Sequence, residues 1–214
     1  MSETALDIWI PDGYMEMPLS GIEERIGVVQ DLVDEMPPAP IVSMAHALLP
    51  AAAALLTELA QRDARYCGIG RHLSSAGGLV TSCLTVCVYE NDGEKTNPRL
   101  ALTHLVESRL ESGDDLGEIE LTDIDGRPML FSERITELPT PEMPAQPYTS
   151  DTTATYQLEA VVPSSDGSAI AAVEMSTAYL DHGPEFRKMI VDMARSVAFR
   201  PSDHPTARPS SLDL

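Results

Sequence analysis

The stretch TYQLEAVVPSSDGSAIAAVEMSTAYLDHGPEFRKMIVDMARSVAF, residues 155–199, decides the fold. Residues 155–162 and 169–179 are rich in β-branched and aromatic side chains, and residues 164–167, Ser-Ser-Asp-Gly, form a turn between them. After Gly183-Pro184-Glu185, apolar residues recur at three- and four-residue steps: Phe186, Met189, Ile190, Met193, Ala194 and Val197. The stretch predicts a β-hairpin followed by an amphipathic helix that closes the domain.

Similar patterns upstream predict further strands and helices. Residues 8–10, 66–73 and 79–90 are typical of strands, and residues 117–138 of a hairpin that turns at Asp125-Gly126. Asn97-Pro98 is typical of a helix start. We expect an α+β fold, with a twisted, mainly antiparallel sheet of about six or seven strands packed against amphipathic helices. Residues 1–200 are expected to form a single domain, and residues 201–214 a flexible Pro/Ser-rich tail.

Two segments near the N-terminus are expected to be helices. In residues 22–36 one face is apolar, with Ile22, Ile26, Val29, Val33 and Met36. Residues 41–60 are apolar enough to resemble a membrane span, but Pro50 divides them and alanine supplies much of their apolarity. The sequence therefore favours a buried helix here, or two short helices joined at Pro50.

The chain is strongly acidic. Its formal net charge is -20 over 214 residues, and residues 1–36 hold nine acidic side chains against Arg25 alone. Residues 107–125 hold eight acidic side chains against Arg109 alone. Such a surface repels phosphate backbones and anionic lipids, so we expect no nucleic-acid partner and no membrane partner.

The cysteines and the N-terminal sequence favour a cytoplasmic location. Cys67, Cys83 and Cys87 are an odd number in a long chain, which is not typical of a disulfide framework. The N-terminus, Met-Ser-Glu-Thr-Ala-Leu-Asp, lacks the basic start and apolar core of a secretory signal.

The order of the expected elements resembles the PsbP/Mog1/LpqN group of α/β sandwiches. The resemblance rests on the turn Ile124-Asp125-Gly126-Arg127-Pro128 and on a late strand pair followed by a closing helix that ends ARSVAF at residues 194–199. The chain also resembles uncharacterised actinobacterial proteins around residues 66–68, Tyr-Cys-Gly, and residues 182–187, His-Gly-Pro-Glu-Phe-Arg. The resemblance implies a PsbP/Mog1-like fold and a binding or assembly role, and it transfers no functional residue.

No group of residues gives a strong signal for catalysis, for a cofactor or for a metal. Cys83 and Cys87 lie four apart on an expected strand, about 13 Å from each other, which is too far for one zinc ion. Cys67 could act as a nucleophile with His72 or His182 as the base, although a buried structural thiol is favoured. Glu118 and Glu120 alternate along a strand, which is typical of a solvated edge or, less often, of a cation site.

These observations favour a non-enzymatic binding or assembly module with a protein partner. The partner would contact the proline-rich loop 139–147, bounded by Pro139 and Pro147, or the acidic surface. One alternative is an accessory or chaperone-like subunit for a secreted or toxic protein, in which the acidic surface shields a basic client. The other is a small hydrolase-like enzyme that uses Cys67 with His72 or His182.

Overall fold

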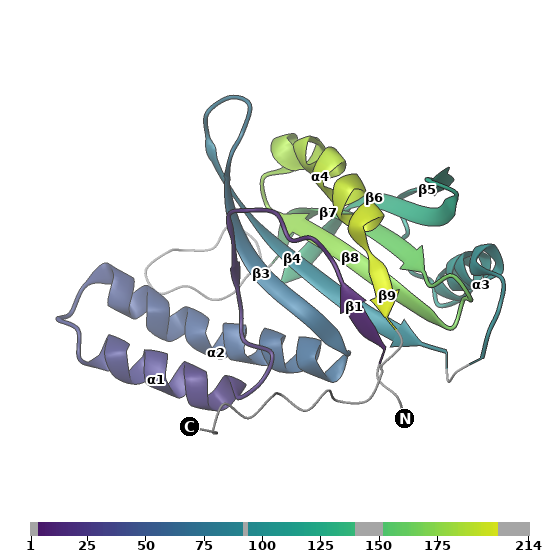
Figure 1. Cartoon of the computed structure of the whole chain (residues 1–214). Helices are drawn as coiled ribbons and strands as arrows, with labels where there is room; N and C mark the ends of the chain where they lie inside the picture. The colour runs from purple at the N-terminus through teal and green to yellow at the C-terminus, as the bar shows by residue number, and fades with distance from the viewer. Residues whose placement is uncertain (1–3, 92–93, 140–151, 201–214) are drawn as a thin grey trace, which may run out of the picture.

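The computed structural model describes residues 4–91, 94–139 and 152–200, which form an α+β domain built on a seven-stranded antiparallel sheet (Figure 1). The strand order is β2-β3-β4-β8-β7-β6-β5. The strands are β2 (Tyr14–Glu16), β3 (Ala64–Leu73), β4 (Leu79–Glu90), β8 (Ala169–Thr177), β7 (Thr152–Pro163), β6 (Arg127–Pro139) and β5 (Glu118–Ile124). The expected fold class is therefore confirmed, with seven strands in the main sheet.

The β7–β8 hairpin forms the middle of the sheet, as its sequence predicts. Leu158 lies opposite Met175, and Ala160 lies opposite Val173, so apolar side chains of both strands share one face. The hairpin β5–β6 turns at Asp125 and Gly126, whose φ angles are 53° and 77°. Two consecutive positive φ angles match the turn type that Asp-Gly favours between antiparallel strands.

The closing helix covers this apolar face of the sheet. A short 3-10 helix, η1 (Leu180–Phe186), contains Pro184 and leads into α4 (Arg187–Ser196), so the α-helix begins a few residues later than the sequence predicts. The predicted apolar stripe packs into the largest core cluster, together with strand residues such as Leu84, Val86 and Val162. This core is the most extensively buried part of the described chain.

A separate two-stranded ribbon joins the first and last described strands. β1 (Ala5–Asp7) pairs antiparallel with β9 (Ala198–Arg200) (Figure 1). The prediction of a strand at residues 8–10 is wrong, because the residues that pair with β9 are 5–7. Ile8 and Ile10 are apolar because they pack against the main core, and that packing requires no strand.

Three helices lie on the opposite face of the sheet. Helix α3 (Pro98–Glu111) begins at Asn97, whose Oδ1 accepts a hydrogen bond from the Arg99 N–H at 2.9 Å, as predicted. It packs on β6 and β7 at one end of the sheet. At the other end lies a helical hairpin of α1 (Ile22–Asp34) and α2 (Pro40–Gln61), which contacts β3 (Figure 1).

The prediction of a buried helix, or of two short ones, between residues 41 and 60 is wrong. Helix α2 continues through Pro50, and within Pro40–Gln61, which the structure describes in full, Leu56 is the single buried residue. The apolar face expected on α1 is also incompletely covered, since Ile22 and Val33 are buried whereas Val29 and Met36 are exposed. Both segments are helical, but they present much of their apolar surface to solvent.

Candidate functional site

The helical hairpin α1–α2 contacts the sheet through a small apolar cluster. Ile22 of α1, Leu56 of α2 and Cys67 of β3 are buried in this cluster. Partly buried neighbours surround them, among them Ala53 and Leu59. The cluster attaches the N-terminal end of α1 and the C-terminal half of α2 to β3, so the rest of the hairpin extends beyond the sheet (Figure 1).

Both helices of the hairpin expose apolar side chains. The exposed fraction is 65% for Ile41 of α2 and 57% for Val28 of α1. We call the exposed set the α1–α2 surface: Val28, Val29 and Leu32 of α1 and Met36 just after it, with Ile41, Met44, Leu48 and Leu55 of α2. Within each helix these positions follow helical spacing, so each set forms a stripe along one side.

The length and composition of α2 would allow it to span a membrane. Its most apolar window has a mean hydropathy of 1.6, and 6% of that window is buried. A core helix of a soluble domain would be largely covered by its own protein. The described residues do not cover α2 in this way, so one apolar side of the helix stays exposed to solvent.

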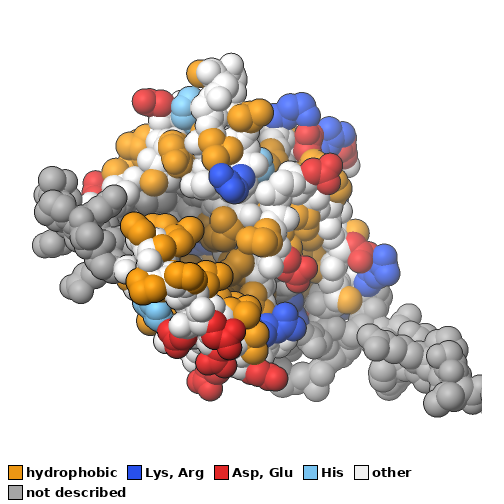
Figure 2. All heavy atoms as spheres, turned by 90° about the vertical axis from the view of Figure 1, so that its left-hand side faces the viewer, with side chains coloured by type: hydrophobic (Ala, Val, Ile, Leu, Met, Phe, Trp, Pro, Cys, Tyr) orange, Lys and Arg blue, Asp and Glu red, His pale blue; other side chains and the backbone are white. Residues whose placement is uncertain are grey.

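The apolar area continues from the hairpin onto the neighbouring strands. Met15 of β2 lies opposite Ile69 of β3, and Leu73 lies opposite Leu79 across the β3–β4 turn. All four are exposed, with Met15 at 68% and Leu73 at 77%. By strand alternation Ile69 and Leu73 share the side of Cys67, which faces the helical hairpin. Figure 2 shows hydrophobic side chains gathered on both sides of a hollow on this face of the molecule.

Acidic side chains lie along one side of the α1–α2 surface (Figure 2). Helix α1 and the residue after it carry five carboxylates and one arginine, Arg25: the acids are Glu23, Glu24, Asp31, Asp34 and Glu35. His46 of α2 contacts Asp34, with its Nε2 3.3 Å from the carboxylate oxygen. Acidic side chains cluster next to the hydrophobic ones in the same view (Figure 2). An incoming apolar segment therefore meets a negative border.

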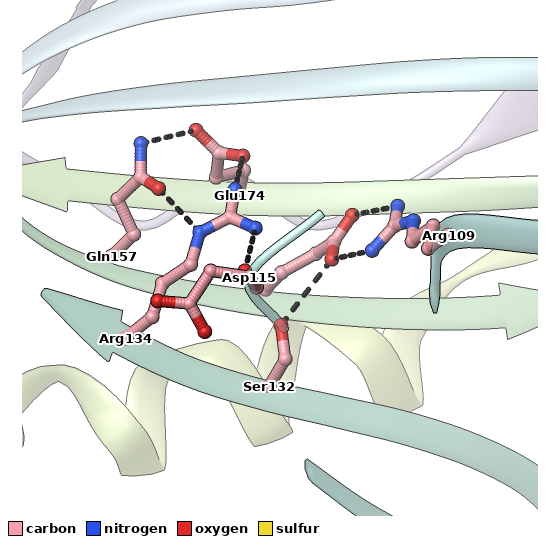
Figure 3. A network of polar contacts seen from close by, with 7 residues as sticks. Arg109, Asp115, Ser132, Arg134, Gln157 and Glu174 are labelled. Carbon is pink, nitrogen blue, oxygen red and sulfur yellow. Dashed lines mark hydrogen bonds and ion pairs between the residues drawn. The ribbon is translucent and has the colours of Figure 1, made fainter. Parts of the chain in front are cut away.

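A second feature on the same side of the sheet is a network of polar side chains (Figure 3). Arg109 of α3 donates two hydrogen bonds to Glu159 of β7, at 2.5 and 2.7 Å. Ser132 of β6 also donates to Glu159, at 3.3 Å. The Glu159 side chain is 8% exposed, so the guanidinium compensates a carboxylate that is largely removed from water.

The network continues along the sheet through Arg134 (Figure 3). Its Nε donates to Gln157 at 2.7 Å, and its Nη1 donates to the carbonyl of Asp115 at 2.9 Å. Glu174 of β8 lies 3.9 Å from the same guanidinium. Burial, followed by the nearby charge of Glu159, raises the pKa of Glu174. These contacts hold α3 and the segment before β5 against the sheet, so the polar side chains of the network have a structural role.

The three cysteines do not form a metal site. Cys83 and Cys87 both lie on β4, as predicted, and no group of three or more metal-ligating side chains occurs among the described residues. Cys67 is buried under the helical hairpin, and all three thiols are free. The Cys67 thiol and burial together raise the pKa of the Cys83 thiol, which disfavours a reactive thiolate there.

His72 and His182 meet on the other side of the sheet from Cys67. Both line a small pocket of about 150 Å³ next to Phe186 and Glu185. His182 Nδ1 lies 3.0 Å from Glu185, and this hydrogen bond lowers the pKa of that carboxylate. Cys67 and His72 are five positions apart on one strand, so their side chains point to opposite faces, about 16 Å apart along it. The structure brings the two histidines together and leaves the cysteine apart from them.

The sequence reasoning missed the α1–α2 surface. The pattern of residues 41–60 holds no signal for it, because an apolar helix face has the same pattern whether the protein's own sheet or a partner covers it. The proline-rich loop lies outside the described residues from 140 to 147, and Pro139 ends β6. Comparison with known proteins adds no assignment, since no family model and no curated protein matches this chain.

Proposed function

We propose that this protein is a non-enzymatic binding module and that its partner protein docks on the α1–α2 surface. The proposal rests above all on helix α2. The structure describes all 22 of its residues, and Leu56 is the single buried one among them. Exposed apolar area that continues over two helices and three strands is costly for solubility. Areas of this kind on soluble proteins mark interaction sites.

The occupant that fits this surface is an amphipathic helical segment of a partner protein, with basic residues along its borders. An apolar helix face packs into a groove between a helical hairpin and a sheet through spaced apolar anchors. The five carboxylates of α1 and its C-cap would attract lysine and arginine on either side of those anchors. A second copy of this chain would instead bring the same carboxylates together, so like charges oppose self-association through this surface.

The chemistry of the surface also supports the related role of an accessory or chaperone-like subunit. Met15, Met36 and Met44 are all exposed on this side of the molecule. Unbranched thioether side chains adapt to different partners, and methionine is frequent on surfaces that hold several clients. The hydrolase-like alternative has less support, because Cys67 lies on the opposite face from His72.

The test uses the full chain and a triple variant, Ile41→Ser, Met44→Ser and Leu48→Ser. The matched control changes exposed leucines elsewhere, Leu100→Ser with Leu110→Ser on α3. The probe is a fluorescent amphipathic helical peptide of leucine and lysine, measured by anisotropy at several salt concentrations. We expect the triple variant to weaken binding by about tenfold or more, and the control to bind like the wild type.

Two further measurements decide between occupants. Analytical ultracentrifugation should show a monomer, and the chain should not float with vesicles of phosphatidylcholine and phosphatidylglycerol. A dimer that the triple variant dissolves would replace the proposed partner with a second copy. Flotation that the triple variant abolishes would show that the surface binds lipid, and equal peptide binding by all variants would contradict the proposed surface.

A further inference from the structure

A groove lies at the other end of the sheet, between the edge strand β5 and helix α4. Helix α4 packs over β7 and β8, the central strands of the hairpin that precedes it, and leaves the outer strands β5 and β6 less covered (Figure 1). The resulting groove has a volume of about 770 Å³. It is separate from the α1–α2 surface, which borders the opposite edge of the sheet.

The groove has an apolar floor and a charged border. Ile124, Phe131 and Leu158 from three adjacent strands line it, together with Ile190 of α4. Its charged lining residues on the same face are Glu118, Glu120, Glu133 and Arg187. An apolar floor beneath charged walls suits a ligand that carries both apolar and charged groups.

The charges in the groove do not balance. Arg187 and Glu133 form a two-point ion pair with distances of 2.5 and 2.7 Å, and the guanidinium lowers the pKa of that carboxylate. Glu118 and Glu120 have no ion-pair partner within residues 4–91, 94–139 and 152–200. The groove therefore carries two unneutralised carboxylates, both on β5.

β5 is also an open edge of the sheet. It is the last strand in the order, and no described strand pairs with its outer side. Its seven residues, Glu118–Ile124, are extended over about 23 Å and offer unpaired backbone N–H and C=O groups. Acidic side chains on an edge can serve to prevent unwanted pairing. That role needs no apolar groove alongside, whereas recognition of an extended peptide uses both.

We propose that β5 and its groove bind an extended peptide segment that adds a strand to the sheet. The backbone of the segment pairs with the outer edge of β5. Its alternate side chains point to the groove, where lysine or arginine pairs with Glu118 and Glu120, and apolar side chains follow next to Thr122 and Ile124. These four residues share one face of β5, so the preferred segment has two basic and then two apolar residues at alternate positions. This site does not depend on the α1–α2 surface.

The probes are two labelled peptides added to the full chain. One is acetyl-Lys-Thr-Lys-Thr-Ile-Thr-Ile-amide, and the other has the reversed sequence, so that parallel and antiparallel addition are both tested. Fluorescence anisotropy at low ionic strength should show saturable binding of one peptide, and added salt should weaken that binding. Two further peptides carry an N-methyl group on the central threonine or on the residue after it, and each lacks one backbone N–H. Because N–H groups of successive strand residues point to opposite sides, one of the two should bind about tenfold more weakly.

The protein variant Glu118→Lys with Glu120→Lys should weaken binding by about tenfold or more. The matched control, Glu107→Lys with Glu111→Lys, makes the same charge change at two exposed positions of α3 and should leave affinity within about twofold. Equal losses in both variants would show that only net charge matters and would overturn the site. No binding of either peptide at millimolar concentration, or full binding of both N-methylated peptides, would overturn it as well.

Discussion

Replacing Arg109 by methionine should destabilise the protein by about 3–5 kcal/mol, because it removes the partner of a covered carboxylate. Glu159 lies in the middle of the sheet, its side chain is 8% exposed, and it accepts two hydrogen bonds from the guanidinium. Ser132 would remain as its hydrogen-bond donor among the described residues, at 3.3 Å. One neutral hydroxyl cannot replace a cation, so most of the desolvation cost of the carboxylate would be uncompensated.

The reverse change should cost less. Glu159→Gln leaves Arg109 without a carboxylate, but the Arg109 side chain is 22% exposed and its long stem lets the guanidinium turn toward water. We expect a loss of about 1–3 kcal/mol for this variant. The double variant Arg109→Met with Glu159→Leu removes both charges and should regain stability to within about 1 kcal/mol of the wild type.

Urea unfolding followed by circular dichroism measures all of these free energies, and the Arg109 and Glu159 changes form a double-mutant cycle. A loss below about 1 kcal/mol for Arg109→Met would contradict the reasoning, since the carboxylate would then have access to water. A double variant as unstable as Arg109→Met would also refute it, because the loss would then come from the packing of α3 rather than from an uncompensated charge.

Four further substitutions test other parts of the structure. Leu56→Ala should cost about 2–5 kcal/mol in urea unfolding, because Leu56 is the buried anchor of α2; a loss under about 1 kcal/mol would show that the helical hairpin unfolds separately from the sheet. Burial raises the pKa of Glu174, so the folded state binds its proton up to a higher pH, and stability should fall as the pH rises through this folded-state pKa. Glu174→Gln should flatten that fall in urea midpoints measured from about pH 4 to pH 8, and an unchanged slope would assign it to other groups. Gly126→Ala should lower the free energy of unfolding by about 1 kcal/mol, because Gly126 has a φ of +77° and a Cβ there would meet open space. Gly167→Ala should lower it by clearly more, because the added Cβ would lie 2.3 Å from the Thr96 carbonyl oxygen. Equal losses for the two variants would contradict this clash.

The strands and the closing helix could be predicted from the sequence because local and long-range preferences agree there. Residues 155–199 combine β-branched strands, a Ser-Ser-Asp-Gly turn and a three- and four-residue apolar repeat, and every one of these features is used in the structure. Asp125-Gly126 likewise specifies a two-residue turn by backbone geometry alone, so the β5–β6 hairpin follows directly from the sequence.

How far α1 and α2 are buried could not be predicted from the sequence. An apolar repeat indicates which side of a helix avoids water, but it does not indicate what covers that side. The stripe of α2 has the same pattern whether its own sheet or another molecule covers it. Similarly, alternation placed Glu118 and Glu120 on one face of a strand and favoured a sheet edge, which the strand order confirms, but the sequence alone could not show that an apolar groove lies beside this edge. Separate sheet faces also explain why Cys67 and His72, only five residues apart, do not meet.

The ribbon β1–β9 determines how the molecule responds to mechanical force. Ala5 pairs with Arg200, so the two strands enter and leave the fold at the same end of the ribbon. Tension applied between the chain ends therefore loads the three residue pairs one after another, as in opening a zipper, rather than all together in shear. Resistance to stretching should be low at first, and an unfoldase that pulls on either end would detach this ribbon before it reaches the seven-stranded sheet.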